Sequence, residues 1–486
     1  MILLAGAAVM LDRENPNNRV HQHEVARQPD EGCDCEGDEL CTHLPLIIID
    51  TGGQEIPGEP LSDDGLTADQ GGDIDYEYNN VTLAADGSKT IRCQVSVIDG
   101  DDSNHHLTDT PTMELSAQIR IRGNTSRFFD KKGYLLNLTK EDGVTNREES
   151  MLGMAPHHEW ALHGPFLDKS LMRNYMWYNI AGEIMDYAPN VRFCEVVLNG
   201  EYQGLYVLVE TITNGEDSRL NMSLPEEGHT TVSYVLRLDR GSSNPIKNID
   251  TFIMYALRNR NMIDIVYPGA SNLTPDRISY IEQEFSDFEK ILYSYDYDTE
   301  PYAWWNYADM DSFAYYFIIN EFTCNYDVGA RSTYVYKDVR DKYKMCIWDM
   351  NSCCDNFHFT QVDPQNFQMQ NITWFYMLAK DEHFVERVIQ RYRELRTTYL
   401  SDQYLNDYID AVIEYLGPAI ERNFQVWGYT FEDYRPLEPD RRNPDNYEAA
   451  VDQLRTFLSE RGAWMDENIE ILLQYCHESK IKKFNH

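Results

Sequence analysis

The sequence predicts an α+β protein with a β-rich first half and a mainly helical second half. Three observations lead to this fold class. Apolar and polar residues alternate in short runs between 44 and 239, as in half-buried strands. From 274 onward the apolar residues recur at three- and four-residue spacing, as in amphipathic helices. A pair of short strands within 334–349 interrupts the helical half. With 486 residues, the chain is long enough for two or three cooperating units.

Residues 1–43 are expected to form a leader or linker, most of it poorly ordered. The stretch 11–43 is polar and rich in Asp, Glu, Asn and Pro, a composition that disfavours a packed core. The apolar start, 1–10, is short and could be the stump of a trimmed signal or anchor segment, or simply a disordered start.

The segment 44–115 is predicted to be an N-terminal β extension with an acidic loop at 58–89. It is followed by a β-rich unit over 116–215, which contains helical spacing at 169–186. Two apolar strands within 191–212 flank Asn199-Gly200, residue types that favour a tight hairpin turn. A strand followed by a Gly-Gly turn is predicted at 44–57, and further strands are predicted at 90–99, 113–123 and 131–138.

The last unit, 216–486, is predicted to be mainly helical after one strand at 231–239. Helical spacing is found at 274–294, at 310–323 and through most of 373–478.

The net charge of −39 limits the choice of partners. The electrostatic field of so negative a chain repels phosphate backbones and anionic lipid, so binding to nucleic acids or to bilayers is not expected. It suits divalent cations and basic partners, although most of these charges are expected only to solvate the surface. No run of 18 apolar residues occurs, so no membrane-spanning helix is predicted.

Three of the ten cysteines, Cys33, Cys35 and Cys41, form a cluster near the N-terminus. Zinc is one interpretation, but a second C-x2-C pair and the histidine spacing of a zinc finger are missing. One or two disulfides in an exported protein are the more natural interpretation.

Two aspartates, Asp327 and Asp349, could form a catalytic pair. A helix is expected to end near Thr323, a loop carries Asp327, and Asp349 follows the second strand of the next hairpin. Phosphoryl transfer needs one acid that orients or deprotonates the attacking hydroxyl and another that holds Mg²⁺. Capping and turn chemistry is the alternative for any such pair.

The sequence motifs around these two aspartates resemble those of the CotH kinase family. NE-x2-CNYDVGARSTYVYKD (320–338) and IWDMN (347–351) are similar to the family's N-E-x-x-x-N-x-D-G-x-x-x-S-T-Y-x-Y-K-D and W-D-[FY]-[DN]. Upstream, IRIRGNTS (119–126) and KKGYLLNL (131–138) resemble two further family segments. The resemblance extends from about 44 to 475 with the order kept.

The resemblance implies a two-lobed, atypical protein-kinase-like fold. Its β-rich N-lobe would cover 116–215, after the extension at 44–115, and its helical C-lobe would cover 216–486. The implied activity is transfer of the γ-phosphate of ATP, with Mg²⁺ or Mn²⁺, to Ser or Thr of a protein substrate. The family also implies a bacterial protein that is secreted or lies on the cell surface or spore coat.

The family pattern assigns roles to residues of the second half. Asp327 corresponds to the acid that faces the substrate hydroxyl, and Asp349 to the acid that binds the metal. Asn351 and Ser332 would be further metal ligands. Cys354-Asp355 departs from the Phe-Gly of the family.

In the first half, Lys132 is the expected catalytic and nucleotide-binding lysine. Lys131 is its rival, because strand alternation sends the two side chains to opposite faces. Arg122 and Asn124 would shape a turn near the phosphates, although a structural turn explains them equally well.

Two further residues of the first half are expected near the nucleotide. Glu210 follows an apolar strand at the expected connector to the adenine site, and Arg173 would orient the lysine or the phosphates. An edge charge and a helix ion pair are the structural alternatives for these two.

Some candidates are weaker. Asp239-Arg240-Gly241 resembles a strand end that faces a cleft. His157, His158 and His163 could bind a transition metal, but a loop packed around Trp160 is the expected structure.

Two other functions are compatible with the sequence. A kinase-like enzyme can transfer AMP or ligate glutamate if the nucleotide binds inverted. The chain could also be an inactive kinase-like protein of the cell surface with a binding or structural role.

Overall fold

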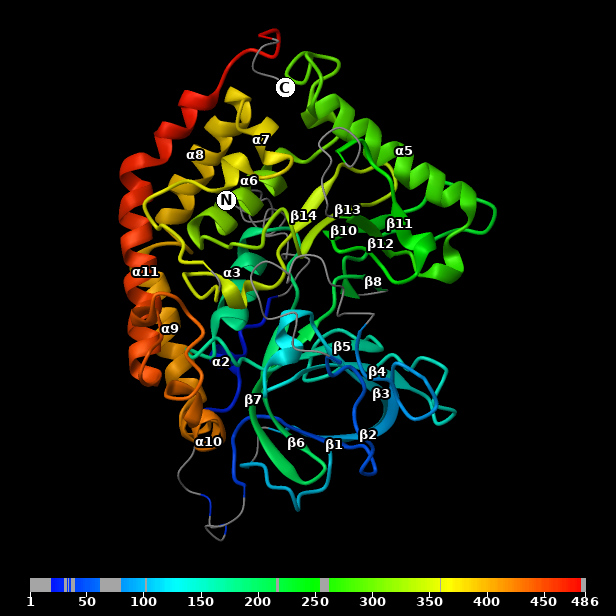
Figure 1. Ribbon diagram of the computed structural model, residues 1–486, viewed down its shortest axis with the longest axis vertical. Coiled ribbons are helices and arrows are strands. Elements are labelled where there is room, and N and C mark those ends of the chain that lie inside the picture. The colour runs from blue at the N-terminus through cyan, green and yellow to red at the C-terminus, as the bar shows by residue number, and fades with distance from the viewer. Residues whose placement is uncertain are drawn as a thin grey trace, which may run out of the picture.

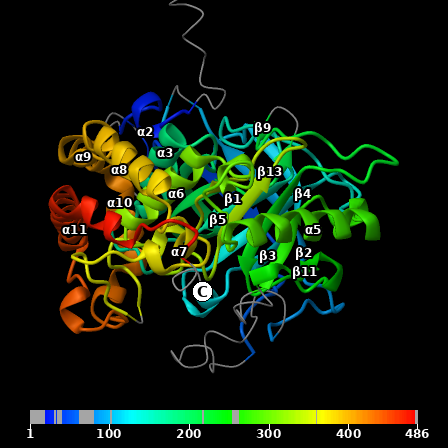
Figure 2. The ribbon, with the colours of Figure 1, turned by 90° about the horizontal axis from the view of Figure 1, so that it is seen from above.

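The computed structural model describes residues 19–29, 33, 35, 40–61, 80–100, 103–215, 218–253, 262–358 and 360–481. Over these residues the protein consists of a closed β-barrel, a second β-sheet and helices that lie largely in the C-terminal half (Figures 1 and 2). The predicted α+β class is therefore confirmed. The described helices include none that is both long and apolar enough to cross a membrane.

Seven strands close into the barrel in the order β1-β2-β3-β4-β5-β7-β6. All neighbours are antiparallel except β1 and β6, whose parallel pairing closes the barrel. Apolar side chains, among them Trp160 and Tyr206, fill its interior. The strands are β1 Leu46–Asp50, β2 Ile91–Ile98, β3 Met113–Arg122, β4 Gly133–Thr139, β5 Glu159–His163, β6 Val191–Leu198 and β7 Glu201–Glu210.

The boundary predicted between 115 and 116 falls inside β3, and strands from both sides of it share the barrel. The hairpin at 191–212 is confirmed, with Asn199 and Gly200 both at positive φ in its turn. The loop expected around Trp160 is wrong, because this residue lies in β5. Both faces of β5 are buried, so its sequence lacks the polar alternation of a half-exposed strand.

Helix α3 (Arg173–Ile184) lies between the barrel and the helical half (Figure 1). Tyr175 stacks on Phe193 of β6 at 4.0 Å between ring centroids, and Trp177 packs against Phe322. The helix is buried on nearly all sides. The helix predicted at 169–186 is thus confirmed, and it forms the shared core of both halves.

The second sheet has the strand order β11-β12-β10-β13-β14. The predicted pair of short strands is present as β13 and β14, but β13 also pairs with β10, so the pair belongs to a larger sheet. β12 was not predicted. The strands are β10 Tyr234–Asp239, β11 Asn248–Ile249, β12 Met262–Tyr267, β13 Thr333–Lys337 and β14 Lys344–Cys346, and a separate ribbon pairs β8 Asn214–Gly215 with β9 Ser218–Arg219.

The helices of the C-terminal half agree with the predicted helical segments. The core that they share with α3 also includes one face of β10, formed by Tyr234, Leu236 and Leu238. In Figure 1, α5 lies on the opposite side of the second sheet from α8, α9 and α11. The helices are α5 Pro275–Leu292, α6 Met310–Phe322, α7 Phe375–Leu378, α8 Glu382–Arg396, α9 Asp402–Leu416, α10 Pro418–Trp427 and α11 Tyr447–Asn468.

Part of the predicted leader packs against the core. Arg19 donates to the backbone oxygens of Tyr178 at 2.5 Å and Ala188 at 2.8 Å. The short helix α2 (Gln22–Val25) follows, and His23 Nδ1 lies 2.9 Å from the Tyr175 hydroxyl. This part of the N-terminal segment is therefore anchored on α3; residues 1–18 lie outside the described residues.

Candidate active site

Three aspartates come together where separate elements end. Asp327 lies in the loop after α6, Asp349 follows β14, and Asp239 ends β10. Ser332 connects two of them, because its N–H donates to Asp239 Oδ2 at 3.1 Å and its side chain partly offsets the rise that burial causes in the pKa of Asp349. The predicted pair thus lies in one cluster with Asp239 and Ser332.

The electrostatics of this cluster favour uptake of positive charge. Burial, followed by the charge of Asp349, raises the pKa of Asp327 to about 7. Burial raises the pKa of Asp349 as well, and the charge of Asp239 adds to the increase. Carboxylates that resist ionisation together become stable as anions when a cation joins them.

Arginines offset the negative charge of the three aspartates. Arg240 pairs with Asp239 at 3.2 Å and lowers the pKa of both Asp327 and Asp349. Arg122, one of the predicted phosphate-site residues, lies over the ring of Trp348 at 5.5 Å and also lowers the pKa of Asp349. A third arginine, Arg331, also lowers the pKa of Asp327, so three cations lie near the three carboxylates.

The residues present fit a hard divalent cation. The Oδ1 atom of Asn351 is buried and has no hydrogen-bond partner among the described residues. Together with the Asp349 carboxylate and the Ser332 hydroxyl it offers the neutral and anionic oxygens that Mg²⁺ and Mn²⁺ prefer. All three predicted metal residues therefore offer oxygen in one region of the fold.

Helix α3 holds the segment that carries Asp349. The Tyr178 hydroxyl accepts a hydrogen bond from the Asp349 N–H at 2.8 Å, where the backbone has a φ of +61°. Arg173 donates to the backbone oxygens of Cys353 at 3.1 Å and Cys354 at 3.4 Å. Its guanidinium is itself fixed by Asp168 at 2.5 Å. Arg173 thus contacts the chain just after Asp349.

Removing the Tyr178 hydroxyl provides a test of this support. Tyr178→Phe leaves the Asp349 N–H without its acceptor, so the free energy of unfolding should fall by about 1–3 kcal/mol. Tyr187→Phe is the matched control, because the buried Tyr187 hydroxyl has no hydrogen-bond partner among the described residues, and it should be neutral or slightly stabilising. Urea unfolding of both variants measures the difference. Equal losses would show that the hydroxyl does not support Asp349.

The segment where the sequence departs from the family pattern has a defined conformation. Cys354 and Asp355 both have positive φ, at +54° and +57°, in the left-handed region that glycine favours. Arg442 pairs with Asp355 at 3.0 Å, and the Cys354 N–H donates to the Thr323 backbone oxygen at 2.7 Å. These contacts tie the Asp349 segment to the start of the Asp327 loop.

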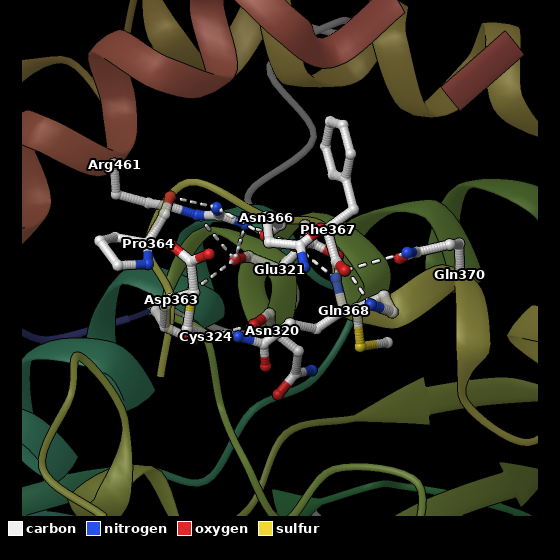
Figure 3. A network of polar contacts seen from close by, with 12 residues as sticks. Asn320, Glu321, Cys324, Asp363, Pro364, Asn366, Phe367, Gln368, Gln370 and Arg461 are labelled. Carbon is white, nitrogen blue, oxygen red and sulfur yellow. Dashed lines mark hydrogen bonds and ion pairs between the residues drawn. The ribbon is translucent and has the colours of Figure 1, made fainter. Parts of the chain in front are cut away.

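A buried ion pair lies at the end of α6, just before the Asp327 loop. Glu321, in the last turn of α6, pairs with Arg461 of α11, and both side chains are fully buried (Figure 3). Arg461 also donates to the backbone oxygens of Pro364 at 2.5 Å and Asn366 at 2.9 Å. Glu321 accepts from the Met369 N–H at 2.7 Å. The pair therefore joins α6, α11 and the chain at 364–369.

A comparison with protein families identifies the chain. A family described as CotH kinase protein matches residues 119–465, from within β3 to within α11. The chain belongs to the CotH kinase family. The match covers well over half of the chain and includes Arg122, the three aspartates of the cluster and both members of the Glu321–Arg461 pair. No curated protein matches the chain.

The two candidate lysines of this CotH kinase family member lie just before β4 and not on the predicted strand, and their side chains have different surroundings. Lys131 is buried and donates to the Leu205 backbone oxygen and to Asn423 Oδ1, each at 2.7 Å. Lys132 is only partly buried, pairs with Glu59 at 2.8 Å and donates to the Arg127 backbone oxygen. The recorded partners of Lys132 thus lie outside the aspartate cluster.

Of the remaining predicted nucleotide residues, Asn124 lies in the turn after β3 and Glu210 at the end of the barrel strand β7. Asn124 precedes a single 3-10 turn, Thr125–Phe128, and its backbone oxygen accepts from the Arg127 N–H. Glu210 ends β7, and its carboxylate accepts from the N–H and the side chain of Asn190 at 2.9 and 3.0 Å. These contacts tie Asn124 to its own turn and Glu210 to the residue before β6.

The three histidines of the CotH-family chain divide between two places. His157 and His158 stack at 4.3 Å, and His158 contacts Glu148 at 2.8 Å. His163 is at the end of β5, where burial lowers its pKa to about 3. They form no three-histidine metal group within the described part of the chain.

The sequence did not predict which residues hold the segments that carry the aspartates in place. Tyr178 lies in DKSLMRNYMWYNI, which resembles a CotH segment, but nothing in it indicated the Asp349 N–H as its partner. Arg442 lies in no such segment, and the contacts of the two residues span 171 and 87 residues of sequence. Arg461 had a local signal, because RGAWMDENI resembles a late segment of the CotH pattern, but nothing in it identified Glu321 as the partner.

Proposed function

We propose that this CotH kinase family member is an active protein kinase that transfers the γ-phosphate of ATP to Ser or Thr hydroxyls of secreted or surface proteins. The observation that carries the proposal is the cluster of Asp327, Asp349 and Asp239 with Ser332. In this proposal the barrel and α3 serve as the N-lobe, and the second sheet with its helices serves as the C-lobe. The site then lies where β10, β14 and the loop after α6 end.

Asp327 is proposed to act on the acceptor hydroxyl. A carboxylate whose pKa lies near 7 can accept a proton at neutral pH more readily than an ordinary aspartate. The backbone of this loop is fixed, because the Asp327 carbonyl accepts from the Arg331 N–H at 2.9 Å. Asp327 thereby orients the hydroxyl and holds its proton during transfer.

Asp349, Asn351 and Ser332 are proposed to hold the metal, with Asp239 behind Ser332. Mg²⁺ or Mn²⁺ bound there would neutralise charge on the β- and γ-phosphates. Arg122 and Arg240 are the two arginines whose charges lower the pKa of Asp349, and we propose that they contact phosphate oxygens. Lys132 remains a proposed phosphate ligand, and its ion pair with Glu59 would have to open first.

The strongly negative chain favours a basic acceptor protein. A net charge of −39 attracts basic segments and repels acidic ones at moderate ionic strength. We therefore propose that Ser and Thr flanked by Lys or Arg are phosphorylated faster than Ser and Thr in acidic peptides.

Transfer from labelled ATP tests the proposed function. The purified chain is incubated with γ-labelled ATP, Mg²⁺ and pooled Ser/Thr peptides, and intact mass is read on every product. Phosphorylation adds about 80 Da per site, whereas transfer of AMP would add about four times as much. Glutamate ligation would consume ATP without labelling the product. A chain that neither transfers label nor binds Mg-ATP by calorimetry would be an inactive family member, and the proposal would fail.

The raised pKa of Asp327 predicts a dependence of stability on pH. Because the folded pKa is about 7 and the ordinary value is 3.8, the folded state keeps a proton that the unfolded state has lost. The stability associated with this carboxyl is therefore present at pH 4 and lost as the pH rises through 7.

Without metal, Asp327→Asn should be more stable than the wild type at pH 8 by about 1–2 kcal/mol, a figure reduced because Asp327 is only partly buried, and the difference in stability should close toward pH 4. Thermal melts in EDTA at both pH values measure it. Asp341→Asn, at an exposed aspartate in the β13–β14 turn, should show no such gap. A pH-independent effect of Asp327→Asn would contradict the prediction.

A further inference from the structure

A group of side chains that could bind a metal lies far from the aspartate cluster in the sequence. Cys33, Cys35 and Cys41 precede β1, and His106 lies in the connection between β2 and β3. Their four ligand atoms, three sulfurs and one ring nitrogen, all lie within 4.8 Å of one another. All ten cysteines of the chain are free, so the disulfide expected within the N-terminal cluster is absent.

From this convergence we propose that Cys33, Cys35, Cys41 and His106 bind one structural Zn²⁺ ion. Three thiolates and an imidazole form one of the ligand sets of structural zinc sites. His106 is separated from Cys41 by all of β1, all of β2 and an acidic loop, so the spacing of a zinc finger does not exist in the sequence. The inference does not depend on the proposed kinase activity.

The distances fit a tetrahedral ion. Zn–S bonds of about 2.3 Å and a Zn–N bond of about 2.0–2.1 Å place sulfur and nitrogen about 3.6 Å apart. Cys33 Sγ lies 3.4 Å from His106 Nε2. A disulfide would bring two sulfurs to about 2.05 Å, and it would leave the third thiol and the histidine without a role.

The surroundings of the four ligands also match a zinc site. The other ring nitrogen of His106, Nδ1, faces Asp109 Oδ2 at 3.4 Å, the carboxylate partner that a zinc-bound histidine commonly has. Asp109 is fixed in turn by the His106 N–H at 2.8 Å. Asn104 donates its side-chain N–H to Cys41 Sγ at 3.1 Å. These contacts leave Nε2 as the ring nitrogen that faces the sulfurs.

The backbone between the two segments is already aligned. Thr42 and His105 exchange hydrogen bonds of 3.1 and 2.6 Å, and His105 Nδ1 lies 2.7 Å from the Leu44 backbone oxygen. Cys41 and His106 are the direct neighbours of this bridge. An ion bound here would clamp the chain before β1 to the β2–β3 connection and so fix the N-terminal segment on the barrel.

Metal content of the purified full chain tests the proposal. The chain is produced without a histidine tag and analysed by mass spectrometry for metals, with an expected content of about one zinc per chain. Cys35→Ser and His106→Ala should remove most of it, whereas His106→Cys should keep it as a four-cysteine site. Cys476→Ser, at a half-buried cysteine outside the cluster, is the matched control and should retain zinc.

Two measurements remain decisive if the ligand variants fail to fold. Titration of the reduced, metal-free wild type with Co²⁺ should produce the thiolate charge-transfer and visible bands of tetrahedral cobalt. Asp109→Asn should weaken zinc binding by about 10–100-fold in competition with a chelator. A disulfide among the three cysteines by peptide mapping, iron in place of zinc, or a reduced wild type that takes up neither zinc nor cobalt would overturn the proposal.

Discussion

Asp349→Asn is expected to lower phosphate transfer by roughly 10³-fold or more. The substitution removes an anionic ligand of the proposed metal, and several kcal/mol of charge stabilisation in the transition state depends on that metal. The fold should survive, because the carboxylate lies among Asp239 and Asp327 and its loss relieves repulsion. Rates measured with labelled ATP over a range of Mg²⁺ concentrations give the comparison.

Two other variants make the test specific. Asp341→Asn removes the same charge from an exposed position in the β13–β14 turn and should retain wild-type rates. Asp327→Asn should lower kcat by about 10²–10⁴-fold while the Mg²⁺ requirement changes little, because it removes the proton acceptor and leaves the metal ligands. Wild-type transfer and Mg²⁺ dependence in Asp349→Asn would rule out its metal role.

Arg461→Met is expected to produce the largest loss of stability, about 3–5 kcal/mol of unfolding free energy. The substitution leaves the fully buried Glu321 carboxylate without its cation (Figure 3). It also removes the donors to the Pro364 and Asn366 backbone oxygens. Because Glu321 directly precedes the Asp327 loop, the rate of phosphate transfer should fall together with stability.

Arg393→Met is the matched control, because Arg393 pairs with Glu470 on the surface, where both side chains are exposed. Its loss should be about 0–1 kcal/mol. Adding Glu321→Gln to Arg461→Met should restore part of the lost stability, since the buried charge disappears and acceptors for the Gln368 and Met369 N–H groups remain. Urea unfolding of the variants measures these differences. If Arg461→Met were as mild as Arg393→Met, the buried pair would not stabilise the fold.

Local patterns were sufficient for most of the strands and helices. The Asn199-Gly200 turn, the β13–β14 pair and α6 follow from spacing and turn chemistry over a few residues. β5 was not predicted, because a strand that is buried on both faces shows no alternation of apolar and polar residues. Local sequence patterns could not predict the closure of the barrel either, because β1 and β6 are far apart in sequence and pair only when the whole barrel forms.

The candidate site shows the same division. The predicted ends of a helix and a strand indicated that Asp327 and Asp349 could lie close together, and the CotH sequence motifs supported their roles. Arg173 and Lys132 were expected at the nucleotide, but their recorded partners are the Cys353 and Cys354 carbonyls and Glu59. A side chain's residue type limits which chemistry it can perform, whereas its partner depends on how distant segments pack.

The sequence by itself was sufficient to predict the fold class, the resemblance to the CotH kinase family and the two candidate aspartates, because these depend on residues that are close together in the chain. Only the tertiary structure decided that Tyr178 holds the Asp349 backbone, that Ser332 connects Asp239 to Asp349, and that His106 joins three cysteines. Some of these contacts link residues 171 and 93 positions apart. They form because burial of the common core brings those segments together, and no local pattern records that packing.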